Sequence, residues 1–282
     1  MSDGAIDIWG VVITLNRRLL LVATMMGLLM TPATASDAVF LHAAGSLRGA
    51  LTEVSQVFEK SSHLKVRAKF GASGLLKDEI ADGAKAEVFA SANMEHPQAL
   101  AEANKSGPVV LFARNKLCAL ARSGLAATSD TLLERMLDPQ VRLGTSTPKA
   151  DPSGDYALEV FRKAEAIRPN AQSILQKKAL QLTGSAASVA PPTGRNIYGW
   201  HIAEGRADIF LAYCTAARDA QKENPGLQII ALPDVLAVSA DYGLTVMAGA
   251  LPGAYQFALF ILSSEGQRIL ASYRFSAPNL PN

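Results

Sequence analysis

Two serines, each placed where a strand-like run gives way to a helix-like run, are the residues of this chain best placed to do chemistry. Ser46 follows the apolar run 39–43, and Ser73 follows the run 66–70. A helix N-terminus presents unpaired N–H groups and the positive end of the helix dipole, so it attracts anions. A serine hydroxyl adds a neutral donor at the same place. The pattern therefore predicts a site for an oxyanion held by neutral donors, and the alternative is that each serine only caps its helix.

Nucleophilic catalysis by either serine has less support. Leu75 stands where a G-x-S-x-G nucleophile motif around Ser73 would need its last glycine, and Ala44 and Arg48 interrupt the motif around Ser46. A secreted serine hydrolase is therefore the competing class of function. The histidines show no metal-ligand spacing, so we expect neither a free metal cation nor a cofactor.

The N-terminal segment predicts export. Arg17 and Arg18 precede an uncharged apolar run over 19–30, and Ala33-Thr34-Ala35 follows as a small-residue cleavage site. This order of basic, apolar and small residues is typical of a secretory signal peptide, here residues 1–35 with cleavage after Ala35. The apolar run is short for a membrane span. We therefore expect the mature protein in the periplasm.

Charge and cysteine content narrow the function further. The formal net charge of +2 is spread without basic runs, so nucleic acid is not an expected partner. The 2 cysteines, Cys118 and Cys214, provide no disulfide framework. An oxidising compartment would allow them to pair, but their apolar strand-like surroundings favour buried free thiols.

Strand-like and helix-like segments alternate along the chain, which indicates an α/β fold with mainly parallel sheets. Strands are expected at 39–43, 66–70, 88–91, 109–121, 141–144, 209–213, 227–232 and 242–248. Helices are expected at 47–60, 75–81, 97–103, 130–137, 155–166, 174–182, 198–204, 254–262 and 266–273, with a loop over 183–193. These are too many strands for one compact sheet, and the long run 109–121 fits a strand that crosses between two domains.

Several short stretches, in the same order along the chain, carry a resemblance to a known family. They are residues 43–47, 70–76, 86–92, 152–154, 196–199 and 212–213. They are similar to stretches of the periplasmic molybdate-binding proteins of ABC importers, and the resemblance covers essentially the whole mature chain. It implies a two-lobed periplasmic-binding-protein fold of type 2, each lobe a mainly parallel sheet flanked by helices and joined by crossing strands. Lobe I would be 36–115 with 240–282, and lobe II would be 116–239.

The resemblance also implies a ligand site between the lobes. Ser46 and Ser73 would offer hydroxyl and N–H donors, Ser153 and Ile197 backbone N–H groups, and Tyr213 its phenol hydroxyl. Neutral donors of this kind compensate the lost hydration of a dianion without placing repelling charges in the empty cleft.

Two charged residues depart from this neutral set. Asp151 comes two residues before Ser153 and could contact the ligand, and its alternative role is an Asx turn that opens the next helix, which we favour. Arg195 could reach the anion or neutralise Asp151, and its alternative role is that of a solvated loop residue, which we also favour.

The resemblance predicts a monomeric solute-binding protein, not an enzyme, that captures molybdate or tungstate and delivers it to an ABC permease in the membrane. Another oxyanion, sulfate or phosphate, is the alternative ligand.

Overall fold

The computed structural model describes Met1 and residues 38–278. The expected signal peptide over residues 1–35 lies, Met1 aside, outside the described residues. Within residues 38–278, no helix is long and apolar enough to cross a membrane.

The described strands form one nine-stranded sheet. They are β1 (Ala38–Ala44), β2 (Lys65–Gly71), β3 (Val88–Ser91), β4 (Val110–Ala121), β5 (Leu143–Ser146), β6 (Leu180–Thr183), β7 (Ile209–Tyr213), β8 (Gln228–Ala231) and β9 (Ser239–Val246). Their order across the sheet is β2-β1-β3-β9-β4-β7-β5-β6, and β8 pairs with β4.

Two groups of parallel strands lie at the two ends of this order. β1 is parallel to β2 and β3, and β5 is parallel to β6 and β7. β9 and β4 join the groups through antiparallel pairs, because β4 pairs with β9 over Val110–Lys116 and with β7 over Leu117–Ala121. This arrangement confirms the α/β fold with crossing strands that the sequence indicates, and the lobe boundaries stay a prediction. The expectation that these strands are too many for one sheet is wrong, because β4 and β9 join both groups into one sheet.

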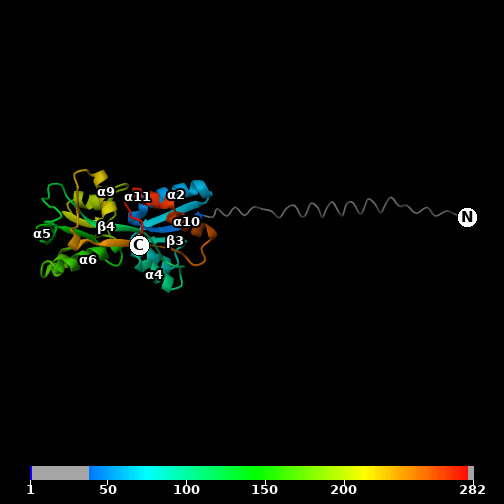
Figure 1. Ribbon diagram of the computed structural model, residues 1–282, viewed down its shortest axis with the longest axis horizontal. Coiled ribbons are helices and arrows are strands. Elements are labelled where there is room, and N and C mark those ends of the chain that lie inside the picture. Colours follow the sequence, from blue (N-terminus) through cyan, green and yellow to red (C-terminus); the bar gives the residue numbers. More distant parts are fainter. Residues whose placement is uncertain (2–37, 279–282) are drawn as a thin grey trace. The chain divides into compact units, whose positions relative to one another are not determined.

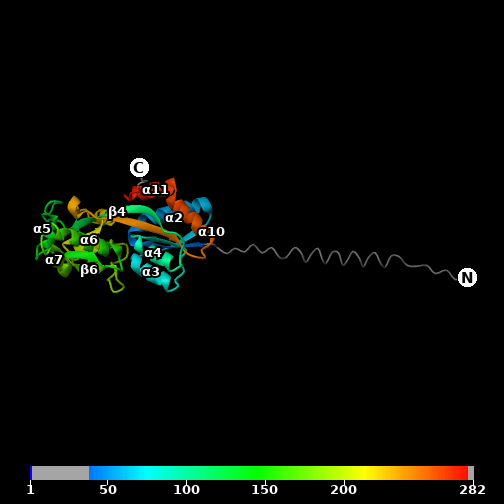
Figure 2. The same cartoon turned by 60° about the horizontal axis from the view of Figure 1, so that its bottom comes forward.

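Helices cover both groups of strands. They are α2 (Arg48–Ser62), α3 (Ser73–Ala81), α4 (Glu95–Glu102), α5 (Leu132–Leu137), α6 (Pro152–Glu165), α7 (Ala171–Lys178), α8 (Ile197–Ala203), α9 (Cys214–Glu223), α10 (Pro252–Leu262) and α11 (Ser264–Ser272), with the 3-10 turns η1 (Gly45–Leu47) and η2 (Asp234–Leu236). In Figure 1, α2, α10 and α11 gather at the end of the molecule that holds β3, and α5, α6 and α9 lie at the other end. Figure 2 shows β4 running between the two ends, with α3 and α4 below it.

The amphipathic pattern of α2 explains how a helix is fixed to the first group of strands. Leu51, Val54 and Phe58 recur at helical spacing and are buried. The ring of Phe58 packs against Phe257 and Phe260 of α10, with ring centroids 5.0 and 5.6 Å apart. Burial of one such aromatic side chain stabilises the fold by about 1.5–3 kcal/mol.

The helix expected over 174–182 is wrong in its second half. α7 ends at Lys178, and Leu180–Thr183 forms strand β6 beside β5, with Gly144 opposite Leu180. The apolar residues of this stretch fit either period, and pairing with a strand distant in sequence decides between them. Helix α9 begins at Cys214, in a stretch where the sequence pattern predicts no helix.

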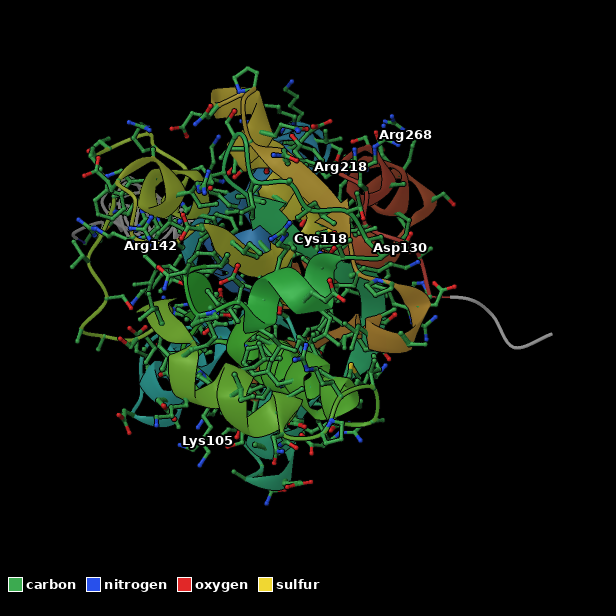
Figure 3. All side chains as sticks on the ribbon, turned by 90° about the vertical axis from the view of Figure 1, so that its left-hand side faces the viewer. Lys105, Cys118, Asp130, Arg142, Arg218 and Arg268 are labelled. Carbon is green, nitrogen blue, oxygen red and sulfur yellow. A yellow bond between two sulfur atoms is a disulfide. The ribbon has the colours of Figure 1, made fainter. Side chains whose placement is uncertain are left out.

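The expectation of free thiols is also wrong, because Cys118 and Cys214 form a disulfide. Their Cα atoms lie 4.9 Å apart although 96 residues separate them in sequence. The register of β4 and β7 sets Cys118 opposite Ala212, close to the start of α9. Cys118 lies near the middle of the view in Figure 3. The disulfide therefore ties the crossing strand β4 to the residue that follows Tyr213.

Candidate functional site

A cavity of about 180 Å³ brings together most of the residues that the sequence singles out. One side, here called the serine wall, is formed by Ala44, Gly45, Ser46, Gly71, Ala72, Ser73 and Ala92. The other side, here called the aspartate wall, is formed by Asp151, Thr183, Gly184, Ile197, Tyr198 and Tyr213. The volume is below the roughly 300 Å³ at which pockets for drug-sized ligands begin, so the cavity suits a small solute.

The parallel pairing of β1 and β2 explains why the two serines meet. Ala44 and Gly71 are opposite each other at the carboxyl ends of these strands, and Ser46 and Ser73 each follow two residues later. Carboxyl ends of neighbouring parallel strands are the usual place for ligands in such sheets. Neither serine is an N-cap, contrary to the expectation: Ser46 lies within η1, and Ser73 is the first residue of α3 after the N-cap Ala72.

The hydroxyl oxygen of Ser73 accepts a hydrogen bond. The N–H of Ala92 donates to Ser73 Oγ over 3.1 Å, and Ser73 is buried. A hydroxyl whose oxygen accepts one hydrogen bond still carries its own hydrogen. Ser73 is therefore set up to donate that hydrogen into the cavity. Ser46 Oγ lies 2.9 Å from the hydroxyl of Tyr242, a residue of β9.

Tyr213 lines the cavity from the opposite side. Its ring is buried and packs edge-on to Tyr156 and Tyr242, with centroids 6.3 and 5.7 Å away. Its hydroxyl has no hydrogen-bond partner among the described residues. Burial raises the pKa of Tyr213 well above the ordinary value, so the phenol stays neutral and keeps its hydrogen.

Ile197 begins α8 and lines the cavity with its neighbour Tyr198. Asn196 caps the helix, since its side-chain oxygen accepts the N–H groups of Tyr198 and Gly199 over 3.0 and 3.1 Å. The side chain of Asn196 does not accept the N–H of Ile197. Tyr198 was not singled out in the sequence, although it lies within the stretch 196–199 that the resemblance rests on.

Asp151 is the N-cap of α6 and also part of the aspartate wall. Its Oδ1 accepts the N–H of Ser153 over 3.1 Å, which is the Asx-type turn that the sequence favours. Gly184, at φ +85°, packs on the carboxyl group so closely that a Cβ there would lie 2.9 Å from Oδ2. Burial raises the pKa of Asp151, and the N–H of Ser153 opposes that rise. The carboxyl group is thus both a helix cap and the acidic group of the cavity.

Ser153 and Arg195 are not among the residues that line the cavity. The N–H of Ser153 is engaged by Asp151, and the buried Ser153 hydroxyl has no partner among the described residues. Arg195 is exposed and pairs with Glu223, which also accepts the N–H of Asn196 over 2.6 Å. The structure therefore gives Arg195 a surface ion pair in place of a contact with Asp151.

The two walls touch through backbone atoms at one edge of the cavity. The N–H of Gly74, at the start of α3, donates to the carbonyl oxygen of Ala150 over 2.9 Å. A Cβ at position 74 would lie 2.3 Å from the oxygen of Lys149, so only glycine allows this approach. Gly74 thus holds the serine wall beside the residue that precedes Asp151.

Two further features limit what the site can do. The described residues hold no group of three His, Cys, Asp or Glu side chains that could bind a metal ion. A larger groove of about 690 Å³ lies elsewhere and is lined by side chains of both charges, among them Glu53, Arg218, Asp219 and Arg274. It contains none of the hydroxyl groups described above. The small cavity is therefore the candidate site.

Comparisons with known proteins agree with this geometry. A family model described as bacterial extracellular solute-binding protein matches residues 39–276. An uncharacterised protein from Pasteurella multocida is 36% identical over 203 residues, which are 72% of this chain and 84% of that protein.

Solved structures with the same fold include oxyanion-binding proteins. The periplasmic molybdate-binding protein of Azotobacter vinelandii is 20% identical, with a TM-score of 0.68 over 86% of this chain and 100% of that chain. The sulfate-binding protein SubI from Mycobacterium tuberculosis is 18% identical, with a TM-score of 0.69 over 86% of this chain and 87% of that chain. At these identities the likeness shows the fold alone.

Proposed function

The chain belongs to the family of bacterial extracellular solute-binding proteins, and we propose that it captures molybdate or tungstate in the cavity described above. In this proposal the protein works in the periplasm as a monomer and delivers the oxyanion to an ABC permease. One observation carries the proposal: Ser46, Ser73 and Tyr213, which each carry a hydroxyl group, line one small cavity from both of its walls.

The chemistry of these donors supports an oxyanion ligand. A dianion that enters a closed cavity loses its hydration, and several convergent hydrogen bonds are needed to replace it. Hydrogen bonds to a charged group contribute about 1.5–3 kcal/mol each, so a few hydroxyl donors account for a tight site. The names of the two oxyanion-binding structures above add support, because this chain shares their fold.

Phosphate is the second candidate, and Asp151 is the reason. An ionised carboxylate in the aspartate wall repels a fully ionised oxyanion, but it accepts a hydrogen bond from an anion that retains a proton, such as hydrogenphosphate. Molybdate and tungstate retain no proton near neutral pH. An ionised Asp151 therefore favours hydrogenphosphate over molybdate and tungstate.

Thermal unfolding of the mature protein with added anions tests the proposal. At a concentration of 100 times the dissociation constant, a bound ligand stabilises the native state by about 2.7 kcal/mol. For a chain of this size that raises the melting temperature by roughly 5–10 °C. We expect this rise with micromolar molybdate and tungstate and a much smaller one with sulfate.

The control is the double variant Ser46→Ala/Ser73→Ala, which should melt near the wild-type temperature and lose the anion-dependent rise. A clear rise with phosphate or sulfate, and none with molybdate or tungstate, would refute the proposed ligand and favour the second candidate.

A further inference from the structure

A chain of hydrogen bonds leads from the interior of the molecule to Ser46. Asn115 lies in the crossing strand β4 and is buried. Its Nδ2 donates to Thr215 Oγ1 over 2.9 Å and to the hydroxyl of Tyr242 over 3.2 Å. The hydroxyl of Tyr242 in turn lies 2.9 Å from Ser46 Oγ. This series of hydrogen bonds therefore joins α9, both crossing strands and the serine wall.

The orientation of the Asn115 amide follows from a further contact. The N–H of Lys116 donates to Asn115 Oδ1 over 2.9 Å, so the oxygen of the amide faces the backbone. The NH₂ group must then face Thr215 and Tyr242, and each of its two hydrogens has one acceptor. All hydrogen-bonding groups of this buried amide are satisfied in this orientation and not in the flipped one.

The direction of the amide fixes the direction of the next bond. Tyr242 is buried, and its hydroxyl oxygen accepts a hydrogen from Asn115. Its own hydrogen needs an acceptor, because buried hydroxyl groups are seldom left unpaired. Among residues 38–278, the only other hydrogen-bond partner of this hydroxyl is Ser46 Oγ. Tyr242 therefore donates to Ser46, which leaves the hydrogen of Ser46 for an acceptor in the cavity.

We infer that Asn115 and Tyr242 are positioning residues that make the Ser46 hydroxyl an obligate hydrogen-bond donor and thereby select an acceptor oxygen at that point of the cavity. The inference rests on the proposed function, because the acceptor is an oxygen of the bound oxyanion. Ser73 reaches the same state by a shorter route, through the N–H of Ala92. Consequently, the hydrogen of Ser46 is directed to a bare oxygen of the anion.

Substitution of Asn115 tests the direction of the chain. Asn115→Asp keeps the shape of the side chain but replaces a donor by an acceptor, so Tyr242 donates to position 115 and its oxygen competes with the anion for the hydrogen of Ser46. We expect molybdate affinity, measured by titration calorimetry, to fall at least tenfold. Asn115→Ala removes the donor without reversing the direction of the hydrogen bonds, and it should lower molybdate affinity threefold or less. A role in packing alone predicts the opposite order, because alanine leaves a cavity and aspartate does not.

A double-mutant cycle separates this effect from simple charge repulsion. In a Ser46→Ala background the hydrogen bonds from Asn115 and Tyr242 have no hydroxyl to orient, so Asn115→Asp should lose its effect on molybdate affinity. An equal loss in both backgrounds would mean that the added charge repels the anion, and it would overturn the inference. Tyr242→Phe, which leaves the Ser46 hydrogen available, should stay within about fivefold of the wild type, and a larger loss would also overturn it.

Neutron diffraction of the ligand-free protein reads the hydrogen directions whatever anion the protein takes. Deuterium on Tyr242 Oη that points to Ser46 Oγ supports the inference, and deuterium on Ser46 Oγ that points to Tyr242 overturns it. If no oxyanion in the thermal test binds, the proposed function fails, and this measurement still decides the state of Ser46.

Discussion

The serine wall and the aspartate wall enclose the same cavity but are built differently. The serine wall comes from turns that follow β1 and β2, and hydrogen bonds from Ala92 and Tyr242 leave its hydroxyl groups as donors. The aspartate wall combines a neutral donor, Tyr213, with an acid, Asp151, whose charge depends on pH. Under the proposed function, one wall provides fixed attraction for an anion and the other tunes which anion is accepted.

The largest effect is expected from the bond that holds the aspartate wall in place. The double variant Cys118→Ser/Cys214→Ser opens a link between residues 96 apart, and loss of a native disulfide of this kind costs about 2–5 kcal/mol of folding free energy. Urea unfolding with and without reductant measures it. Because Cys214 follows Tyr213 directly, anion affinity should fall as well, although the serine wall is unchanged.

The single variants serve as the control, since either one breaks the bond and should match the double variant. Equal stability of wild-type and double-variant proteins under oxidising conditions would show that the bond does not stabilise the aspartate wall.

The next largest effect falls on the serine wall. Ser46→Ala and Ser73→Ala each remove one donor to a charged ligand and should weaken molybdate binding by about 1.5–3 kcal/mol. Tyr213→Phe removes the donor of the other wall and should cost a similar amount. Titration calorimetry gives the affinities, and circular dichroism should show an unchanged fold in all three variants. Wild-type affinity in both serine variants would remove the serine wall from the site.

The two walls also differ in how far the sequence predicts them. Ser46 and Ser73 belong to short local turns, so the residue pattern alone places both between a strand and a helix, and their role as donors to a ligand stays a prediction. The aspartate wall depends on contacts between distant segments: β6 forms only beside β5, and the disulfide joins residues whose proximity no local pattern reports. The Asx turn of Asp151 is local and was expected, but its place in the cavity depends on Gly184.

The positioning residues illustrate the same limit. Asn115 and Tyr242 stand in strand-like runs with nothing in the sequence to mark them. They are diagonal neighbours because β4 and β9 pair with Asn115 opposite Ala240 and Ala113 opposite Tyr242. Hydrogen-bond direction is a property of the assembled network, so a sequence reading finds the terminal serine and misses the residues that orient it.

A smaller effect, which appears as a pH dependence, should come from Asp151→Asn. Burial raises the pKa of Asp151 above its ordinary 3.8, so the carboxyl group loses its proton as the pH rises through that raised value. The resulting charge repels a fully ionised oxyanion. Wild-type molybdate affinity should therefore fall, by up to about tenfold (1.4 kcal/mol), as the pH rises through that raised pKa. Asn is neutral throughout and keeps the Ser153 contact, so the variant should bind with little dependence on pH.

The unliganded protein supplies the control for this pH series. A carboxyl group whose pKa is raised by folding lowers the free energy of unfolding as the pH rises through the raised pKa, and Asp151→Asn should remove that contribution. Weaker molybdate binding by the variant at every pH would instead make the carboxylate a direct ligand of the metal oxyanion.

The smallest effect is expected at Arg195, the charged residue near the aspartate wall that the cavity does not include. Its guanidinium group pairs with Glu223 at the surface, where its side chain is 43% exposed. Exposed pairs of this kind contribute about 0–1 kcal/mol, and salt screens them. Arg195→Ala should therefore lower stability by no more than that amount and leave molybdate affinity within about twofold of the wild type.

Glu223 also accepts the N–H of Asn196, the cap of α8, so the matched variant Glu223→Ala should disturb α8 more than Arg195→Ala does. Calorimetric titrations at low and at physiological salt decide the point. A tenfold loss with Arg195→Ala that disappears at higher salt would mean that this arginine attracts the anion from outside the cavity, and the aspartate wall would then carry a fixed positive charge beside its titratable acid.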